Sequence, residues 1–154
     1  MALYGPVYDN LWREAQSNTS DTTFSGAGGW QNYMNRSFTS TARGPIIVSA
    51  AIALGYESGA VNAKTRFILG SSVGNAGNGT SMEFGLGVQR DSNRLDSGTG
   101  ALLYNFNNIA AGSYVVTWQV NNTTSNTTLK LGGLHNPGSG SQMDNIHVMY
   151  CKGA

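Results

Sequence analysis

Apolar and polar residues alternate through most of this chain, and the clearest example lies in its last third. From Tyr114 to Asn121 the sequence reads Tyr-Val-Val-Thr-Trp-Gln-Val-Asn, which places Tyr114, Val116, Trp118 and Val120 on one side. A period of two residues predicts a strand with one buried face. Similar segments recur between clusters of Gly, Asn and Ser, and none of comparable length has the 3.6-residue period of a helix. The pattern therefore predicts an all-β protein of about eight strands.

The same signals predict the other strands. We expect them over residues 30–40, 45–56, 64–69, 82–88, 102–106, 127–131 and 145–152. In the second, the apolar run from Ile46 to Leu54 predicts burial on both faces. A helix is the alternative for Ser49 to Leu54, but the flanking Gly44-Pro45 and Gly55 favour a strand. Because no helical crossover lies between the strands, we expect two antiparallel sheets, arranged as a jelly-roll β-sandwich.

The first 25 residues differ from the rest because they carry large apolar groups without a clear strand pattern. These groups are Tyr4, Tyr8, Leu11 and Trp12. We expect an N-terminal arm over residues 1–25, with at most one short helical turn from Asp9 to Gln16, and a single jelly-roll domain over residues 26–154. The arm is too short to enclose its own apolar groups, so they pack either on the same sandwich or on a neighbouring subunit.

The composition is poor in charge. Charged residues make up 11% of the 154 residues, against about 25% in an average soluble domain, and 21 residues are glycine. Interface cores are depleted in charge, so this composition fits a protein that spends its life assembled, and it fits turn-rich β structure equally well. The net charge is +1 and the basic residues are scattered, which makes nucleic acid an unsuitable partner.

The single cysteine and the N-terminal sequence indicate where the chain is synthesised. Its single cysteine, Cys151, excludes an internal disulfide and a multi-cysteine zinc site. The N-terminus lacks the basic and apolar regions of a signal peptide, and no apolar run is long enough to span a membrane. We therefore expect synthesis in a cytoplasm and no membrane partner.

No pattern of catalytic or cofactor-binding residues stands out. His135 and His147 have no third histidine and no adjacent carboxylate cluster, so we expect no metal site. Neither the phosphate-binding motifs nor the Gly-x-Ser-x-Gly motif is present. The acidic pairs that a glycosidase would need are Glu57 or Glu83 with Asp91 or Asp96, but nothing in their spacing demands this chemistry. The sequence therefore predicts a protein that is not an enzyme and that uses no cofactor.

One segment carries a family resemblance. Ile109 to Val120 reads Ile-Ala-Ala-Gly-Ser-Tyr-Val-Val-Thr-Trp-Gln-Val. It resembles the strand with an aliphatic residue, Gly, any residue, Tyr and then alternating apolar residues found in jelly rolls of the tumour-necrosis-factor and complement C1q type. Many bacteriophage head-decoration and fibre-tip domains share that pattern, and Asn145 to Tyr150 is similar to their last strand. The resemblance implies a jelly roll over about residues 25–152, in a fold that usually forms trimers.

The resemblance implies a phage structural protein. As a decoration, or cement, protein it would bind the major capsid protein on the outer surface of the virion as a homotrimer, with the arm from Tyr4 to Trp12 contacting the shell or a neighbouring subunit. The alternative is a receptor-binding fibre tip, in which Trp30, Asn32 and Tyr33 contact a host surface glycan, although such aromatic residues also commonly fill a core. A hydrolase, the third hypothesis, would require two close carboxyl groups in a cleft.

Overall fold

A computed structural model describes residues 11–18, 22–26, 28–58, 61–88, 99–131 and 144–151, and all of its regular elements are strands. The strands are β1 (Leu11–Asn18), β2 (Thr22–Ser25), β3 (Gln31–Ser40), β4 (Gly44–Ser58), β5 (Val61–Gly70), β6 (Gly79–Thr80), β7 (Phe84–Val88), β8 (Thr99–Ile109), β9 (Gly112–Asn122), β10 (Thr128–Leu131) and β11 (Asp144–Cys151). The prediction of an all-β fold is confirmed. Eight of the strands match the expected ones, and β1, β2 and β6 were not expected.

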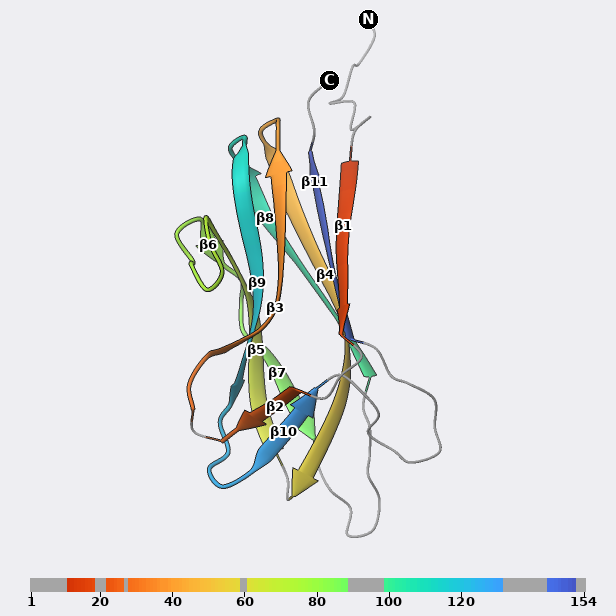
Figure 1. The fold of residues 1–154 in the computed structure, drawn as a ribbon, viewed down its shortest axis with the longest axis vertical. Helices are drawn as coiled ribbons and strands as arrows, with labels where there is room; N and C mark the ends of the chain where they lie inside the picture. The colour runs from red at the N-terminus through yellow and green to blue at the C-terminus, as the bar shows by residue number, and fades with distance from the viewer. Residues whose placement is uncertain are drawn as a thin grey trace, which may run out of the picture.

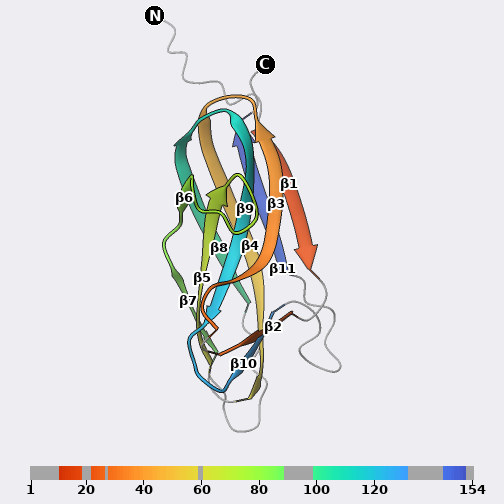
Figure 2. The same ribbon diagram turned by 60° about the vertical axis from the view of Figure 1, so that its left-hand side comes forward.

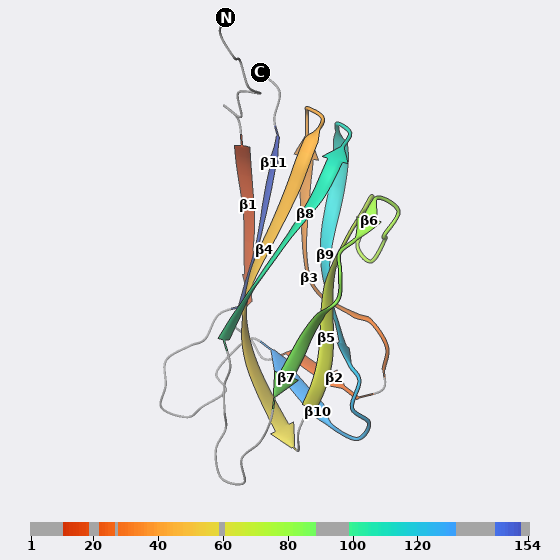
Figure 3. The same cartoon turned by 180° about the vertical axis from the view of Figure 1, so that it is seen from behind.

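The strands form two antiparallel sheets that enclose one core (Figure 1). In the first sheet, β11 lies between β1 and β4, and β8 pairs with β4 along most of its length (Figure 3). β10 pairs with the end of β4 and carries β2 on its other edge. In the second sheet, β9 lies between β3 and β5, and β6 and β7 both pair with β5 (Figure 2).

The apolar run in β4 forms a strand, so the helix considered for Ser49 to Leu54 is not formed. Ile46, Val48, Ala50 and Ile52 are buried in the core, as alternation along a strand requires. The expectation that both faces of this strand are buried is wrong for the chain by itself. Ile47, Ser49 and Ala51 face outward and are only half-buried.

Aromatic residues of β5 and β9 pack together in the core. Trp118 is fully buried and packs against Phe67, with ring centroids 6.0 Å apart. Its indole N–H donates to the hydroxyl of Thr65, which in turn donates to the backbone carbonyl of Gln119 at 2.8 Å. The buried polar groups of Trp118 and Thr65 are therefore satisfied, which removes the penalty of burying them unpaired.

The expected arm is a strand from residue 11 onward. β1 pairs with β11 from Leu11 opposite Cys151 to Asn18 opposite Asp144, and β2 pairs with β10. The helical turn expected up to Gln16 is therefore wrong. Tyr4 and Tyr8 lie outside the described residues, and for Leu11 and Trp12 the structure describes the backbone.

Candidate interaction surfaces

Part of the outer face of the second sheet is covered by the chain itself. Residues 71–78, which we call the covering loop, fold back over β9 beside β6 (Figure 1). The amide of Gly74 donates to the hydroxyl of Thr117 at 3.0 Å, and Thr117 is fully buried. Gly70 lacks the Cβ atom that would stand 2.2 Å from the carbonyl oxygen of Asn75. The glycine thus permits the loop to lie directly on the sheet, where it keeps Ile68 and Thr117 from solvent.

Beside the covering loop, the same face carries a shallow groove with a volume of about 390 Å³. Its lining includes the hydroxyl groups of Ser37, Thr39, Ser71 and Ser113. Two of these hydroxyls, on Thr39 and Ser113, lie 3.1 Å apart and hydrogen bond to each other. Phe38, Tyr114 and Val115 also line the groove, so its lining is both polar and apolar.

A chain of side chains crosses the outer face of the second sheet near the start of β3. The guanidinium group of Arg66 lies 4.0 Å from the ring centroid of Trp30. The Nε of Arg66 donates to Oε1 of Gln119 at 2.9 Å, and Nε2 of Gln119 donates to Oδ1 of Asn32 at 2.8 Å. The alternation of β5 and β9 places Arg66 and Gln119 outward and opposite each other, since Phe67 and Trp118 face the core.

The structure separates the three residues expected to contact a glycan. Trp30 and Asn32 belong to the polar chain around Arg66, and Asn32 is exposed. Tyr33 instead packs against the core, with its ring 5.5 Å from Phe24 and 5.1 Å from Trp118 in edge-on geometry. A register shift in the pairing with β9 falls at this residue and accounts for the break in alternation.

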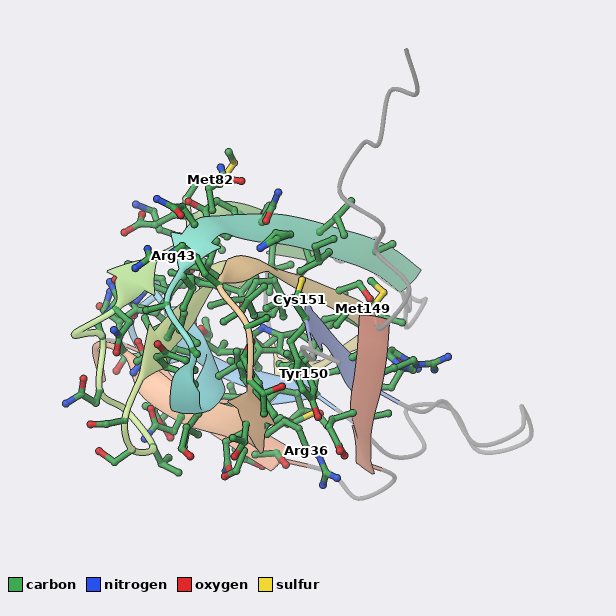
Figure 4. All side chains as sticks on the ribbon, turned by 90° about the horizontal axis from the view of Figure 1, so that it is seen from above. Arg36, Arg43, Met82, Met149, Tyr150 and Cys151 are labelled. Carbon is green, nitrogen blue, oxygen red and sulfur yellow. The ribbon has the colours of Figure 1, made fainter. Side chains whose placement is uncertain are left out.

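The outer face of the first sheet is different, because apolar side chains, among them Ile47, Leu103 and Met149, lie on it between polar ones. Three rows of side chains run across β1, β11, β4 and β8, and we call them together the apolar face. The rows are Arg13, Met149, Ile47 and Asn105; Ala15, His147, Ser49 and Leu103; and Asn145, Ala51 and Ala101. Figure 4 shows Met149 and Cys151 on the side of β11 opposite Tyr150, which points into the core.

The apolar face is open to solvent in the single chain. Leu103 is 65% exposed, and Ile47, Ala51 and Met149 are half-buried. Arg13 is the only residue in the three rows with a formal charge at neutral pH. An exposed apolar surface of this kind is characteristic of a site that contacts another protein.

Arg13 is tied to the one titratable neighbour in these rows. Its Nε donates to Nδ1 of His147 at 2.7 Å. Partial burial, together with the adjacent guanidinium charge of Arg13, lowers the pKa of His147 below its ordinary value of 6.5. His147 is therefore held in its neutral form, which accepts the hydrogen bond from Arg13.

An ion pair joins the two sheets at the edge where β1 faces β3. Arg36, on the inner side of β3, pairs with Glu14 of β1, and both side chains are about one-third exposed, at 39% and 32%. Tyr150 lies beneath them, 2% exposed, and its ring centroid is 4.8 Å from that of Phe38. Burial and the Glu14 carboxylate raise the pKa of Tyr150, while Arg36 opposes them. An ion pair thus bridges the two sheets at this edge.

The candidate acidic pairs of a glycosidase are not assembled in the described part of the chain. The Glu83 carboxylate forms an ion pair with Lys64 at 2.8 Å, and the other three candidate side chains lie outside the described residues. Among the residues that the structure describes, no group of three or more His, Cys, Asp or Glu could hold a metal ion. The described ranges also contain no helix long and apolar enough to cross a membrane.

The Gly-x-Tyr segment that carries the family resemblance stabilises the turn between β8 and β9. The hydroxyl of Tyr114 donates to the carbonyl of Ala110 at 2.8 Å, across the turn between β8 and β9. A Cβ on Gly112 would stand 3.1 Å from that hydroxyl oxygen, so glycine allows the tyrosine to fold back. The motif therefore fixes a turn.

Comparison with protein-family models and with curated protein sequences finds no match for the chain.

Proposed function

We propose that this protein is a structural subunit that works in an assembled state, as a decoration protein on the outer surface of a phage capsid. In this proposal it forms a homotrimer, binds the major capsid protein and acts without catalysis or a cofactor. The observation that carries the proposal is the apolar face. In β4 the sequence has the pattern of a strand buried on both faces, yet the chain buries one of them, and a subunit contact would bury the other.

The strand order supports a jelly-roll sandwich, which is the fold implied by the resemblance. Without the short strands β2, β6 and β10, eight strands remain. They are arranged as β1-β11-β4-β8 in one sheet and β3-β9-β5-β7 in the other. In each sheet, strands from the beginning and the end of the chain alternate, as they do in the paired Greek keys of jelly rolls.

Two substitutions of equal exposure test the role of the apolar face. Leu103 lies on this face and is 65% exposed, and Met82, between β6 and β7, is 64% exposed. We expect Leu103→Arg to convert the assembled protein to single chains, because it would bury an unpaired charge in the contact, and Met82→Arg to leave the assembly intact. Light scattering coupled to size exclusion gives both masses. A wild-type protein that runs as a single chain would contradict the proposal of a homotrimer.

The virion role has its own test. Quantitative mass spectrometry of purified particles of the source phage would give the copy number relative to the major capsid protein. A comparable copy number supports the decoration role. A much smaller number favours the fibre tip, and absence from the particle removes both roles.

Contact between the arm and the shell stays a prediction. Its test must now spare β1, because removing residues 11–18 would strip a strand from β11. Deletion of residues 2–10 removes Tyr4 and Tyr8 and leaves that pairing in place. We expect the shortened protein to lose affinity for capsids while keeping its oligomeric state, and unchanged capsid binding would reject the contact.

The second candidate function is glycan binding by a receptor-recognition tip. The outer face of the second sheet favours it, because Trp30 lies there beside the guanidinium group of Arg66, and Asn32 lies there beside the amide of Gln119. Aromatic rings and amides are the groups that hold sugars in protein sites. Tyr33 has no part in this version, since it packs on the core.

A further inference from the structure

The guanidinium group of Arg66 is held from two directions. Trp30 covers its flat surface at 4.0 Å, and Gln119 accepts a hydrogen bond from its Nε at 2.9 Å. Gln119 is itself 7% exposed and is fixed by Asn32. A free arginine side chain loses much rotamer entropy when a ligand orders it. Because these contacts already restrict Arg66, binding a ligand would cost less entropy.

The same group has no acidic partner among the residues that the structure describes. The two described glutamates with placed side chains, Glu14 and Glu83, pair with Arg36 and Lys64. Within the described part of the chain, Arg66 forms its hydrogen bond through Nε. Its two terminal amino groups have no hydrogen-bond partner among the described residues, and they form a planar pair of donors that matches the two oxygens of a carboxylate.

We propose that Arg66 anchors a binding site for the carboxylate group of an acidic sugar. The neighbouring outward positions favour a sugar over a peptide, because Asn32 and Asn121 carry amides that can bind hydroxyl groups. Lys64, two residues along β5, forms an ion pair with Glu83, so Arg66 supplies the unpaired positive charge of the site among the described residues. The site does not depend on the virion role, since either a decoration protein or a fibre tip could carry it.

Nuclear magnetic resonance titration of the full chain tests the site directly. We would follow the side-chain signals of Arg66 Nε–H, the Gln119 amide and the Trp30 indole N–H during addition of glucuronate. Glucose, acetate and inorganic phosphate serve as probes that separate the sugar ring from the charge. We expect glucuronate to shift all three signals with saturation, and the other three probes to bind at least tenfold more weakly.

Equal binding of acetate or phosphate would overturn the proposal, because it would reduce the site to a general attraction for anions. Equal binding of glucose, or no shift with glucuronate, would also overturn it. If a short peptide ending in a free carboxylate bound as tightly as glucuronate, the sugar assignment would be wrong.

Two variants identify the responsible geometry. Arg66→Lys keeps the charge but loses the planar pair of donors, and we expect at least tenfold weaker binding of glucuronate. Gln119→Met keeps the size but releases Nε of Arg66, and we expect a smaller loss. Arg43→Lys is the control, because Arg43 is exposed and contacts Asn108 at the other end of the strands. Unchanged affinity in both test variants, with folded spectra, would reject the role of Arg66.

Discussion

The outer faces of the two sheets differ in how the central strand of each is shielded from solvent. Central strands β4 and β9 each have an apolar or uncharged side turned away from the core. On β9 the covering loop hydrogen bonds to Thr117 on that side, and Thr117 is fully buried. On β4 the corresponding side stays half-buried. A strand can thus be covered from within the chain, while the uncovered strand leaves a surface suited to a partner.

Residues on the two outer faces are expected to contribute to different properties, namely the stability of the single chain and its assembly. Side chains under the covering loop contribute to the folding of the single chain, because folding alone removes them from water. Side chains on the apolar face contribute mainly when another molecule covers them. Substitutions on the two faces should therefore differ in which measurement they change.

A matched pair of isoleucines gives the largest expected effect. Ile68 and Ile47 both point outward from central strands, but Ile68 is 1% exposed and Ile47 is half-buried. We expect Ile68→Ala to lower the free energy of unfolding by about 3 kcal/mol. Ile47→Ala should cost about 1 kcal/mol or less in the dissociated chain. Urea denaturation at low protein concentration measures both, and equal losses would refute the contrast between the faces.

A smaller effect is expected at the hydrogen bond that fixes the covering loop. Thr117→Val keeps the shape of the side chain but leaves the Gly74 amide without its acceptor, at a cost of about 1–2 kcal/mol. Thr39→Val is the matched control on the same face, where the hydroxyl is exposed, and should change stability by no more than about 0.5 kcal/mol. Hydrogen exchange at Gly74 should accelerate in the first variant alone. Unchanged exchange would mean that the loop is held by other contacts.

The smallest expected effect is the pH dependence from His147. Its pKa is lowered in the folded state, so the unfolded chain binds the proton more readily. Its contribution to stability is therefore fully present above pH 6.5 and is lost as the pH falls from 6.5 through the folded-state pKa. His147→Gln should flatten this part of the curve of unfolding free energy against pH, and Arg13→Gln should raise the pKa of His147 measured by magnetic resonance. An unaltered curve would show that Arg13 and burial leave this histidine unaffected.

Period-two alternation predicted eight of the strands because each of them buries one face in the core. β4 and β9 are the clearest examples, since Val48 and Trp118 are fully buried. β1 escaped prediction because its strand character comes from pairing with β11, at the far end of the chain. Local propensity cannot report such a partner.

The candidate sites were only partly predictable for a related reason. Trp30 and Asn32 stand out as an aromatic residue beside an amide, but Arg66 and Gln119 join them only through the pairing of β5 with β9. Tyr33 looked equivalent to Trp30, and the register shift in β3 turned it toward the core. The apolar face could be anticipated in part, since the run in β4 carries too many apolar residues for one buried side.

The position of β11 also bears on how the chain reaches this structure. β11 separates β1 from β4, and it brings Arg13 beside His147, 134 residues away. Such long loops must close before the pairing yields any stability, so folding on the scale of milliseconds to seconds is expected. Until β11 is made, the edges of β1 and β4 that it will occupy lack their partner. The first sheet is therefore completed late, and its unfinished edges are open to strands of other chains during that interval.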